Sequence, residues 1–72
     1  MVLRINDIDP DGVRVAAPWE DLRVGMSFFV PCINTAKCIK QADEVAANLG
    51  YSLAYRTRVE GEKFGLRIWR TA

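Results

Sequence analysis

Near the end of the chain, four cationic side chains and one tryptophan alternate with apolar residues in a pattern suited to binding an anion. Two runs with period-two alternation, 51–60 and 63–70, predict a β-hairpin. Its expected register places Arg56 directly opposite Arg67. The same face of the hairpin carries the remaining members of this set, Arg58, Lys63 and Trp69.

The opposed arginines indicate that this face binds a negatively charged partner. Like charges directly across a β-ladder destabilise it, so the pair favours neutralisation by a polyanion, a carboxylate cluster or a subunit interface. Nucleic acid supplies phosphates for the cations and bases that stack on an exposed tryptophan such as Trp69. The alternative is a solvated charged face in which Trp69 packs beneath its own arginines through cation–π contacts.

A second group of cations lies at the start of a predicted helix. Lys37 and Lys40 fall in its first turns, where positive charge opposes the helix dipole. An anion bound near Asn34, Thr35 and Lys37 would relieve this repulsion. The alternative is that both lysines point into water.

No set of residues indicates catalysis, and the sequence contains no histidine. A His-based triad or acid–base pair is therefore excluded, and a cysteine nucleophile would lack its usual base. Cys32 and Cys38 are six residues apart without further zinc ligands, so we expect two buried apolar side chains. We expect neither an enzyme nor a bound metal or other cofactor.

The acidic stretch between Asp7 and Gly12 imitates the first half of a calcium loop, with carboxylates at its first, third and fifth positions. The second half does not match a calcium loop, because Pro18 stands where a bidentate glutamate is needed and Pro10 stiffens the loop. We interpret the stretch as an acidic turn, with the option that it screens the basic hairpin in the free protein.

The elements that position these residues are a strand, a helix and the hairpin. Residues 26–30 predict a strand that stops at Pro31. A helix is predicted from Ala36 to residue 49, with Asn34 or Thr35 as its N-cap and Gly50 as its C-cap. The hairpin is expected to turn through a type II′ turn that begins with Gly61.

This order predicts an α+β fold, a small β-α-β-β domain. Its sheet has three mainly antiparallel strands and is covered on one face by the helix. The domain is expected to span residues 18–72 and to begin with a single helical turn at 17–22. Residues 1–17 predict an acidic N-terminal arm or hairpin, with a weak strand over 1–8 and a returning strand over 12–16.

The length and charge of the chain indicate a small single domain with an uneven charge distribution. A chain of 72 residues forms one domain with a small core, so a homodimer or a bound partner is expected. The net charge of +1 hides an acidic head, with two cations and five anions in residues 1–21, and a basic body, with eight cations and four anions in residues 22–72. Neither a membrane span nor an export signal is expected, and the cysteines are expected to be reduced thiols in a cytosol.

Two motifs place aromatic, glycine, proline and arginine residues at fixed positions: WEDLRVGMSFFVP at 19–31 and GLRIWR at 65–70. They resemble a family of short tailed-phage proteins of unknown function, with the pattern W-x-x-L-x-V-G-x-S-F-F-V-P and a closing G-L/V-R-I/V-W-R. The match covers residues 18–71. The resemblance implies a phage-encoded protein of the host bacterial cytoplasm, from a family suspected of binding nucleic acid. Its basic positions correspond here to Arg56, Arg67 and Arg70, with Trp69 beside them.

The helix departs from that family, whose members have a more basic helix. It carries Asp43 and Glu44 beside its two lysines, and Met26 replaces an acid before Ser27. These departures favour the sheet face over the helix as the binding surface.

Three hypotheses follow. The first is a small accessory or regulatory phage protein that binds DNA or RNA, single- or double-stranded, through Arg56, Arg58, Lys63, Arg67, Trp69, Arg70, Lys37 and Lys40. The second is a module that docks on a host protein with an acidic patch, such as an enzyme or a transcription or defence complex, since Trp and Arg are enriched at interface hot spots. The third is a virion or scaffold component that assembles through its N-terminal strand.

Overall fold

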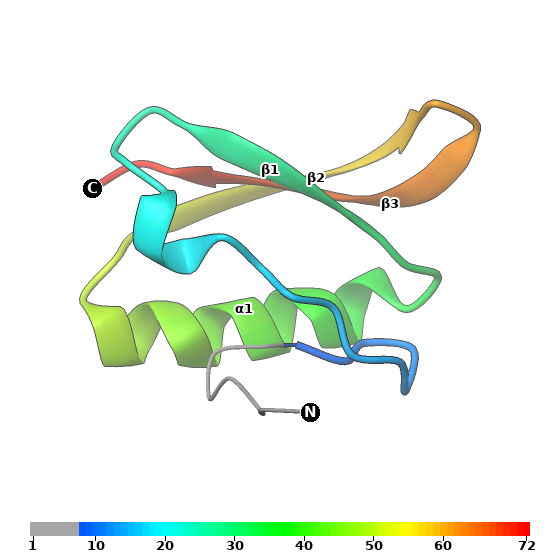
Figure 1. The fold of residues 1–72 in the computed structure, drawn as a ribbon, viewed down its shortest axis with the longest axis horizontal. Helices are drawn as coiled ribbons and strands as arrows, with labels where there is room; N and C mark the ends of the chain where they lie inside the picture. The colour runs from blue at the N-terminus through cyan, green and yellow to red at the C-terminus, as the bar shows by residue number, and fades with distance from the viewer. Residues whose placement is uncertain (1–7) are drawn as a thin grey trace.

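The computed structural model describes residues 8–72, which form a sheet, an α-helix and a short 3-10 helix. The elements follow in the order η1 (Trp19–Asp21), β1 (Ser27–Pro31), α1 (Thr35–Leu49), β2 (Leu53–Glu60) and β3 (Lys63–Arg70). The strands lie in the order β1-β3-β2, and both neighbouring pairs are antiparallel. Helix α1 lies along one face of the sheet (Figure 1). The predicted α+β fold class is therefore confirmed.

Helix α1 begins and ends with the predicted caps. The Asn34 side chain accepts a hydrogen bond of 3.0 Å from the Lys37 backbone N–H, as an N-cap does. Gly50 ends the helix with a φ of 74°, in the left-handed region that glycine adopts without strain. The side of α1 that packs on the sheet is formed by Cys38, Ala42, Val45 and Ala46. Within residues 8–72, the helices lack the length and hydrophobicity that a membrane-spanning segment needs.

Strands β2 and β3 form the predicted hairpin with the predicted register, in which Glu60 pairs with Lys63 and Arg56 with Arg67. The turn between them differs from the predicted type II′ turn. Gly61 and Glu62 have φ values of 54° and 68°, and positive φ at both central positions is typical of type I′. The difference lies at Glu62, whose φ is positive, whereas a type II′ turn has positive φ at Gly61 alone.

Strand β1 pairs with the central strand β3 and is shifted one residue beyond its predicted bounds. At the end of this pairing, Pro31 lies opposite Gly65. A Cβ atom at Gly65 would collide with the Val30 carbonyl oxygen and would lie 2.8 Å from the Pro31 Cα. The absence of a side chain at Gly65 therefore allows β1 to approach β3 closely.

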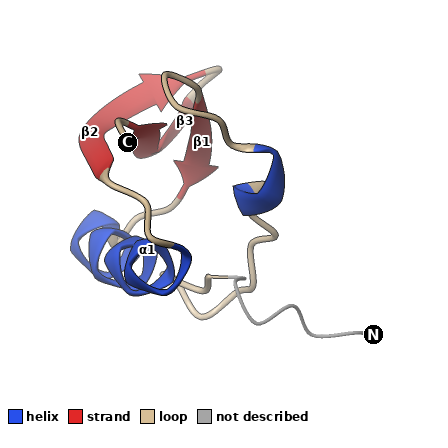
Figure 2. Ribbon diagram, turned by 90° about the vertical axis from the view of Figure 1, so that its left-hand side faces the viewer, coloured by secondary structure: helices blue, strands red, loops and turns tan. Residues whose placement is uncertain are grey.

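The core lies between the sheet and α1, and η1 closes its side. Trp19 is 1% exposed, and its ring meets the Phe28 ring edge to face, with centroids 5.1 Å apart and planes at 87°. Leu66 and Ile68 of the central strand are completely buried in the same core. Figure 2 shows α1 and η1 on the same side of the sheet, and no described element covers the other side. Residues 8–72 thus leave one face of the sheet open.

The N-terminal segment packs into the same core, since Ile8 and Ala17 are 2% and 5% exposed. Ile8 and Val15 form an isolated antiparallel bridge with two backbone hydrogen bonds. In the described part of the chain, this bridge replaces the predicted pair of N-terminal strands. Residues 1–7 of the predicted first strand lie outside the described residues.

Candidate nucleic-acid interface

The sheet face turned away from α1 is called the open face, and the strand registers define its members. They are Ser27, Phe29 and Pro31 of β1, Lys63, Gly65, Arg67 and Trp69 of β3, and Ala54, Arg56, Arg58 and Glu60 of β2. Four of these side chains are cations and one is a carboxylate. Five predicted binding residues therefore share one surface: Arg56, Arg58, Lys63, Arg67 and Trp69.

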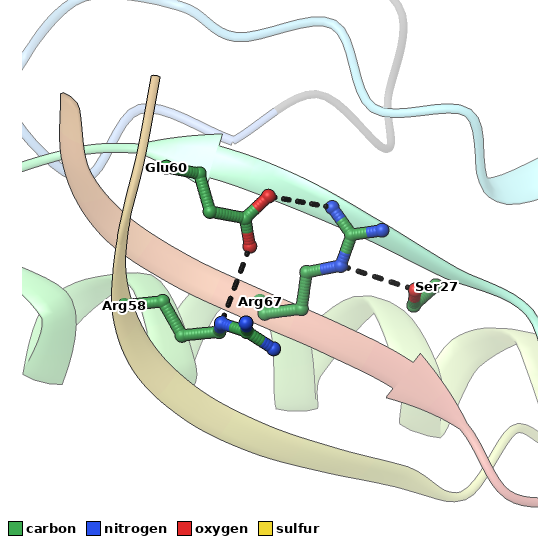
Figure 3. Close-up of polar contacts among 4 residues, drawn as sticks. All are labelled: Ser27, Arg58, Glu60 and Arg67. Atoms are coloured by element: carbon green, nitrogen blue, oxygen red, sulfur yellow. Dashed lines mark hydrogen bonds and ion pairs between the residues drawn. The ribbon is translucent and has the colours of Figure 1, made fainter. Parts of the chain in front are cut away.

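Arg67 lies at the centre of the open face and is held by both neighbouring strands. Its Nε–H donates to the Ser27 Oγ at 3.1 Å, and its Nη1–H donates to the Glu60 Oε1 at 3.2 Å (Figure 3). The Arg67 side chain is 29% exposed. Arg67 is therefore a fixed, half-buried cation that ties β1 to the end of β2.

Glu60 supplies the carboxylate that partly neutralises the opposed arginines. Its Oε1 accepts from Arg67, and its Oε2 lies 3.6 Å from the Arg58 Nε (Figure 3). Oε2 is buried and accepts no hydrogen bond within the described part of the chain. The protein itself thus provides some of the neutralisation that the opposed arginines were expected to need. Three cationic charges remain in excess on the open face.

Arg56 differs from Arg67 in being exposed. Its side chain makes no hydrogen bond or ion pair with residues 8–72, and the same holds for Lys63 at the end of the hairpin. Because neither cation has a partner in this range, both are available to an external anion without the loss of an internal contact.

Two aromatic side chains lie beside these cations. Trp69 follows Arg67 on the same face of β3, as predicted, and it is partly exposed. Phe29 of β1 lies directly opposite Arg67, and the end of its ring reaches over Gly65. Phe29 was missed by the sequence analysis, because its face follows from the pairing of β1 with β3. No local signal in residues 27–31 indicates that face, because Phe28, Phe29 and Val30 are consecutive apolar residues.

Arg70 lies apart from this surface, although it was predicted to belong to it. Two positions after Ile68, it shares the α1 side of the sheet, where its guanidinium carbon lies 3.6 Å from the centre of the Tyr51 ring. Its Nη1–H donates to the Leu22 carbonyl oxygen at 2.9 Å. Arg70 therefore anchors η1 and the end of β3. Its cation–π contact is with Tyr51. The interpretation of the hairpin as a solvated charged face expected such a contact at Trp69.

The start of α1 is not an open anion site, because Asp11 occupies it. The Asp11 carboxylate accepts from the backbone N–H groups of Ile33 and Asn34 at 2.8 and 2.9 Å. These hydrogen bonds, together with the nearby Lys37, hold the pKa of Asp11 below its usual value. The expected anion near Asn34 is thus a side chain of the protein itself.

The acidic turn is fastened to α1 by a second contact. The Asp9 backbone N–H donates to the Gln41 Oε1 at 2.7 Å, and the Gln41 Nε2 donates back to the Asp9 carboxylate at 2.8 Å. Figure 1 shows this segment beside α1 and away from the open face of the sheet. The option that the turn screens the basic hairpin is therefore wrong for Asp9 and Asp11, while Asp7 lies outside the described residues.

Lys37 and Lys40 also lie away from the open face. Both are exposed, since the side of α1 that carries Cys38 and Ala42 packs on the sheet. They line a shallow hollow on the helix together with Gln41 and Glu44. The predicted binding set thus divides into five residues on the open face and three elsewhere.

The buried titratable groups lie on the α1 side of the sheet. Cys32 and Cys38 are free cysteines and are 4% and 0% exposed. Burial raises the pKa of Cys38 to about 12 and also raises that of Cys32. Burial likewise raises the pKa of Tyr55, whose hydroxyl donates to Asp43. These groups stay protonated at neutral pH, so they offer no reactive thiolate.

Within residues 8–72, no cluster of three or more His, Cys, Asp or Glu side chains could hold a metal ion. Comparison with protein families, curated protein sequences and solved structures finds no match to this chain. The resemblance to the tailed-phage family therefore stays a prediction, and the case for function depends on the open face.

Proposed function

We propose that this protein binds nucleic acid through the open face, as a small accessory or regulatory protein. The observation that carries the proposal is the direct opposition of Arg56 and Arg67 on a sheet face that no described element covers. Arg58 and Lys63 extend the same positive surface, and Glu60 is its single carboxylate. A polyanion fits this arrangement because it brings several negative charges at once.

Affinity on such a surface comes mainly from phosphates. Each phosphate that a cation neutralises releases a condensed counterion, so binding weakens as salt increases. The slope of log K against log salt is about −0.9 per neutralised phosphate on duplex DNA and about −0.7 on a single strand. Contacts from all four cations of the open face would give a slope of about −2.8 on a single strand and about −3.6 on duplex DNA.

The resemblance to tailed-phage proteins suggests the setting, in which a phage-encoded protein meets nucleic acid in the host bacterial cytoplasm. A homodimer is part of the proposal, because a chain this short buries only about 60% of the surface that its unfolded form exposes. Sedimentation equilibrium measures the subunit count.

The proposal is tested by fluorescence anisotropy of labelled DNA and RNA, titrated with the protein at low and physiological salt. We expect micromolar or tighter binding at low salt that weakens steeply as salt rises. Absence of binding to every nucleic acid at low salt contradicts the proposal.

A protein ligand with an acidic patch is the second candidate. It is favoured by the position of Trp69 next to Arg67, because tryptophan and arginine are the residues most enriched at binding hot spots. A stoichiometric partner retained from nuclease-treated host lysate, together with no binding to purified nucleic acid, would favour it over the first.

A further inference from the structure

We propose that the ligand of the open face is single-stranded nucleic acid, with its phosphates over β2 and its bases stacked on Phe29 and Trp69. This inference rests on the proposed function and specifies its substrate. It is carried by the distribution of cations and aromatic rings across the three strands, which only the observed strand order reveals.

Cations and aromatic rings are distributed unequally across the open face, although the central strand β3 carries both, with Lys63 and Arg67 beside Trp69. The edge strand β2 contributes Arg56 and Arg58 to this face and no aromatic ring. The opposite edge strand β1 contributes Phe29 and no cation, and Trp69 lies on β3 between them. A strand of nucleic acid that follows β2 with its phosphates therefore has its bases directed towards the aromatic rings.

The two aromatic residues occupy neighbouring positions. Phe29 lies opposite Arg67, and Trp69 is two residues further along β3, so the two form a diagonal pair across adjacent strands. Diagonal neighbours in an antiparallel sheet lie about 7–8 Å apart, which places the rings close enough to receive consecutive unstacked bases. Arg67 lies between them and is held in place by Ser27 and Glu60.

A duplex fits this surface less well. Its bases are stacked on each other, so their faces are unavailable to Phe29 and Trp69. The outer strands of a three-stranded sheet lie about 10 Å apart before side chains are added, whereas the major groove, about 12 Å wide, accepts a helix or a two-stranded ribbon. Helix α1 offers no alternative for the groove, because Asp11 occupies its N-terminal end and Glu44 accompanies its lysines.

Two probes of equal length distinguish the alternatives: an oligothymidylate of about 15 nucleotides, near the upper site size of single-domain binders, and the corresponding duplex. Anisotropy gives the affinity for each, and intrinsic tryptophan fluorescence reports stacking. Trp19 is 1% exposed, so quenching on addition of the oligonucleotide reports on Trp69. We expect at least tenfold tighter binding of the single strand, with quenching that Trp69→Phe removes.

Substitutions of the stacking residues sharpen the test. Phe29→Leu and Trp69→Leu are each expected to weaken single-strand binding about tenfold, because each removes one stacked base. Phe64→Leu is the matched control, because Phe64 is a half-exposed aromatic residue of β3 on the α1 side of the sheet. Thermal melting checks that every variant is folded. Fluorescence quenching of the unsubstituted protein tests base stacking even if a variant fails to fold.

The possible failures are distinguishable. If single strand and duplex bind equally and tryptophan fluorescence does not change, the single-strand inference is overturned while nucleic-acid binding stands. If Phe64→Leu weakens binding as much as Phe29→Leu, the stacking role of Phe29 is overturned. If neither probe binds at low salt, the proposed function fails and this inference fails with it.

Discussion

Arg56 and Arg67 lie directly opposite each other on β2 and β3, but of these two arginines Arg67 alone forms an ion pair with Glu60 within residues 8–72. Arg67 is 29% exposed and bonded on two sides, whereas Arg56 is exposed and makes no ion pair within residues 8–72. Two arginines in one cross-strand pair therefore have different roles. Arg67 contributes to the stability of the sheet, and Arg56 is available to a ligand.

This difference predicts unequal effects on stability. Arg67→Ala is expected to lower the free energy of unfolding by about 1–3 kcal/mol, because it leaves the partly buried Glu60 carboxylate without its donor. Arg56→Ala is expected to change it by no more than about 0.5 kcal/mol, as exposed substitutions usually do. Urea unfolding followed by circular dichroism measures both. Equal losses in the two variants would contradict the assignment.

Glu60 is predicted to oppose ligand binding. Glu60→Gln removes the one carboxylate of the open face while keeping the shape of the side chain, so Arg58 and Arg67 become more attractive to phosphate. A partly exposed ion pair is worth up to about 1 kcal/mol, which corresponds to about fivefold tighter binding at low salt. Anisotropy titration measures this change, with Glu44→Gln on α1 as the control. Weaker binding by a folded Glu60→Gln variant would contradict the prediction.

Asp11 is predicted to make stability depend on pH. Because hydrogen bonds from the Asn34 and Ile33 N–H groups lower its pKa in the folded state, the ionised form stabilises the fold. This contribution is fully present above the unfolded-state pKa of about 3.9 and is lost as pH falls through the lower folded-state pKa. Asp11→Asn is expected to lower the melting temperature at pH 7, with a difference that shrinks below about pH 4.

Thermal unfolding of both proteins across this range measures the effect. Asp21→Asn, which changes an exposed carboxylate on η1, is the control. A difference between wild type and Asp11→Asn that stays constant down to the lowest pH would show that the hydrogen bonds do not depend on ionisation.

Gly65 is predicted to be essential for the contact of β1 with β3. Gly65→Ala places a Cβ against the Val30 carbonyl oxygen and the Pro31 Cα, both backbone atoms that cannot rotate away. Overpacking of this kind typically destabilises a protein by about 1–3 kcal/mol. Urea unfolding measures the loss, and an unchanged midpoint would contradict the observed approach of the strands.

The elements with local signals were predictable from the sequence. Asn34 and Gly50 mark the ends of α1, and the alternation around Gly61 sets the hairpin register, so both were placed correctly. The pairing of β1 with β3 has no comparable local signal, because the two strands are far apart in the chain. For this reason the prediction of the open face lacked Phe29, whose position depends on that pairing.

The remaining differences also concern contacts between distant segments. The sequence indicated an anion at the start of α1, but only the folded chain shows that Asp11 provides it. Arg70 entered the predicted site through the resemblance to the phage family. Because side chains alternate between the two faces of a strand, Arg70 was already expected on the same side as Ile68. Its contacts with Tyr51 and Leu22 confirm that it lies on the α1 side of the sheet.

The most direct test of binding at the open face compares the salt dependence of binding in two variants of equal charge. Arg56→Ala removes an exposed cation from the open face, and Lys40→Ala removes one from the far side of α1. If the ligand binds the open face, Arg56→Ala reduces the magnitude of the slope of log K against log salt by about one unit, while Lys40→Ala leaves it unchanged. Equal reductions in both variants, or an unchanged slope in Arg56→Ala, would contradict the assignment of binding to the open face.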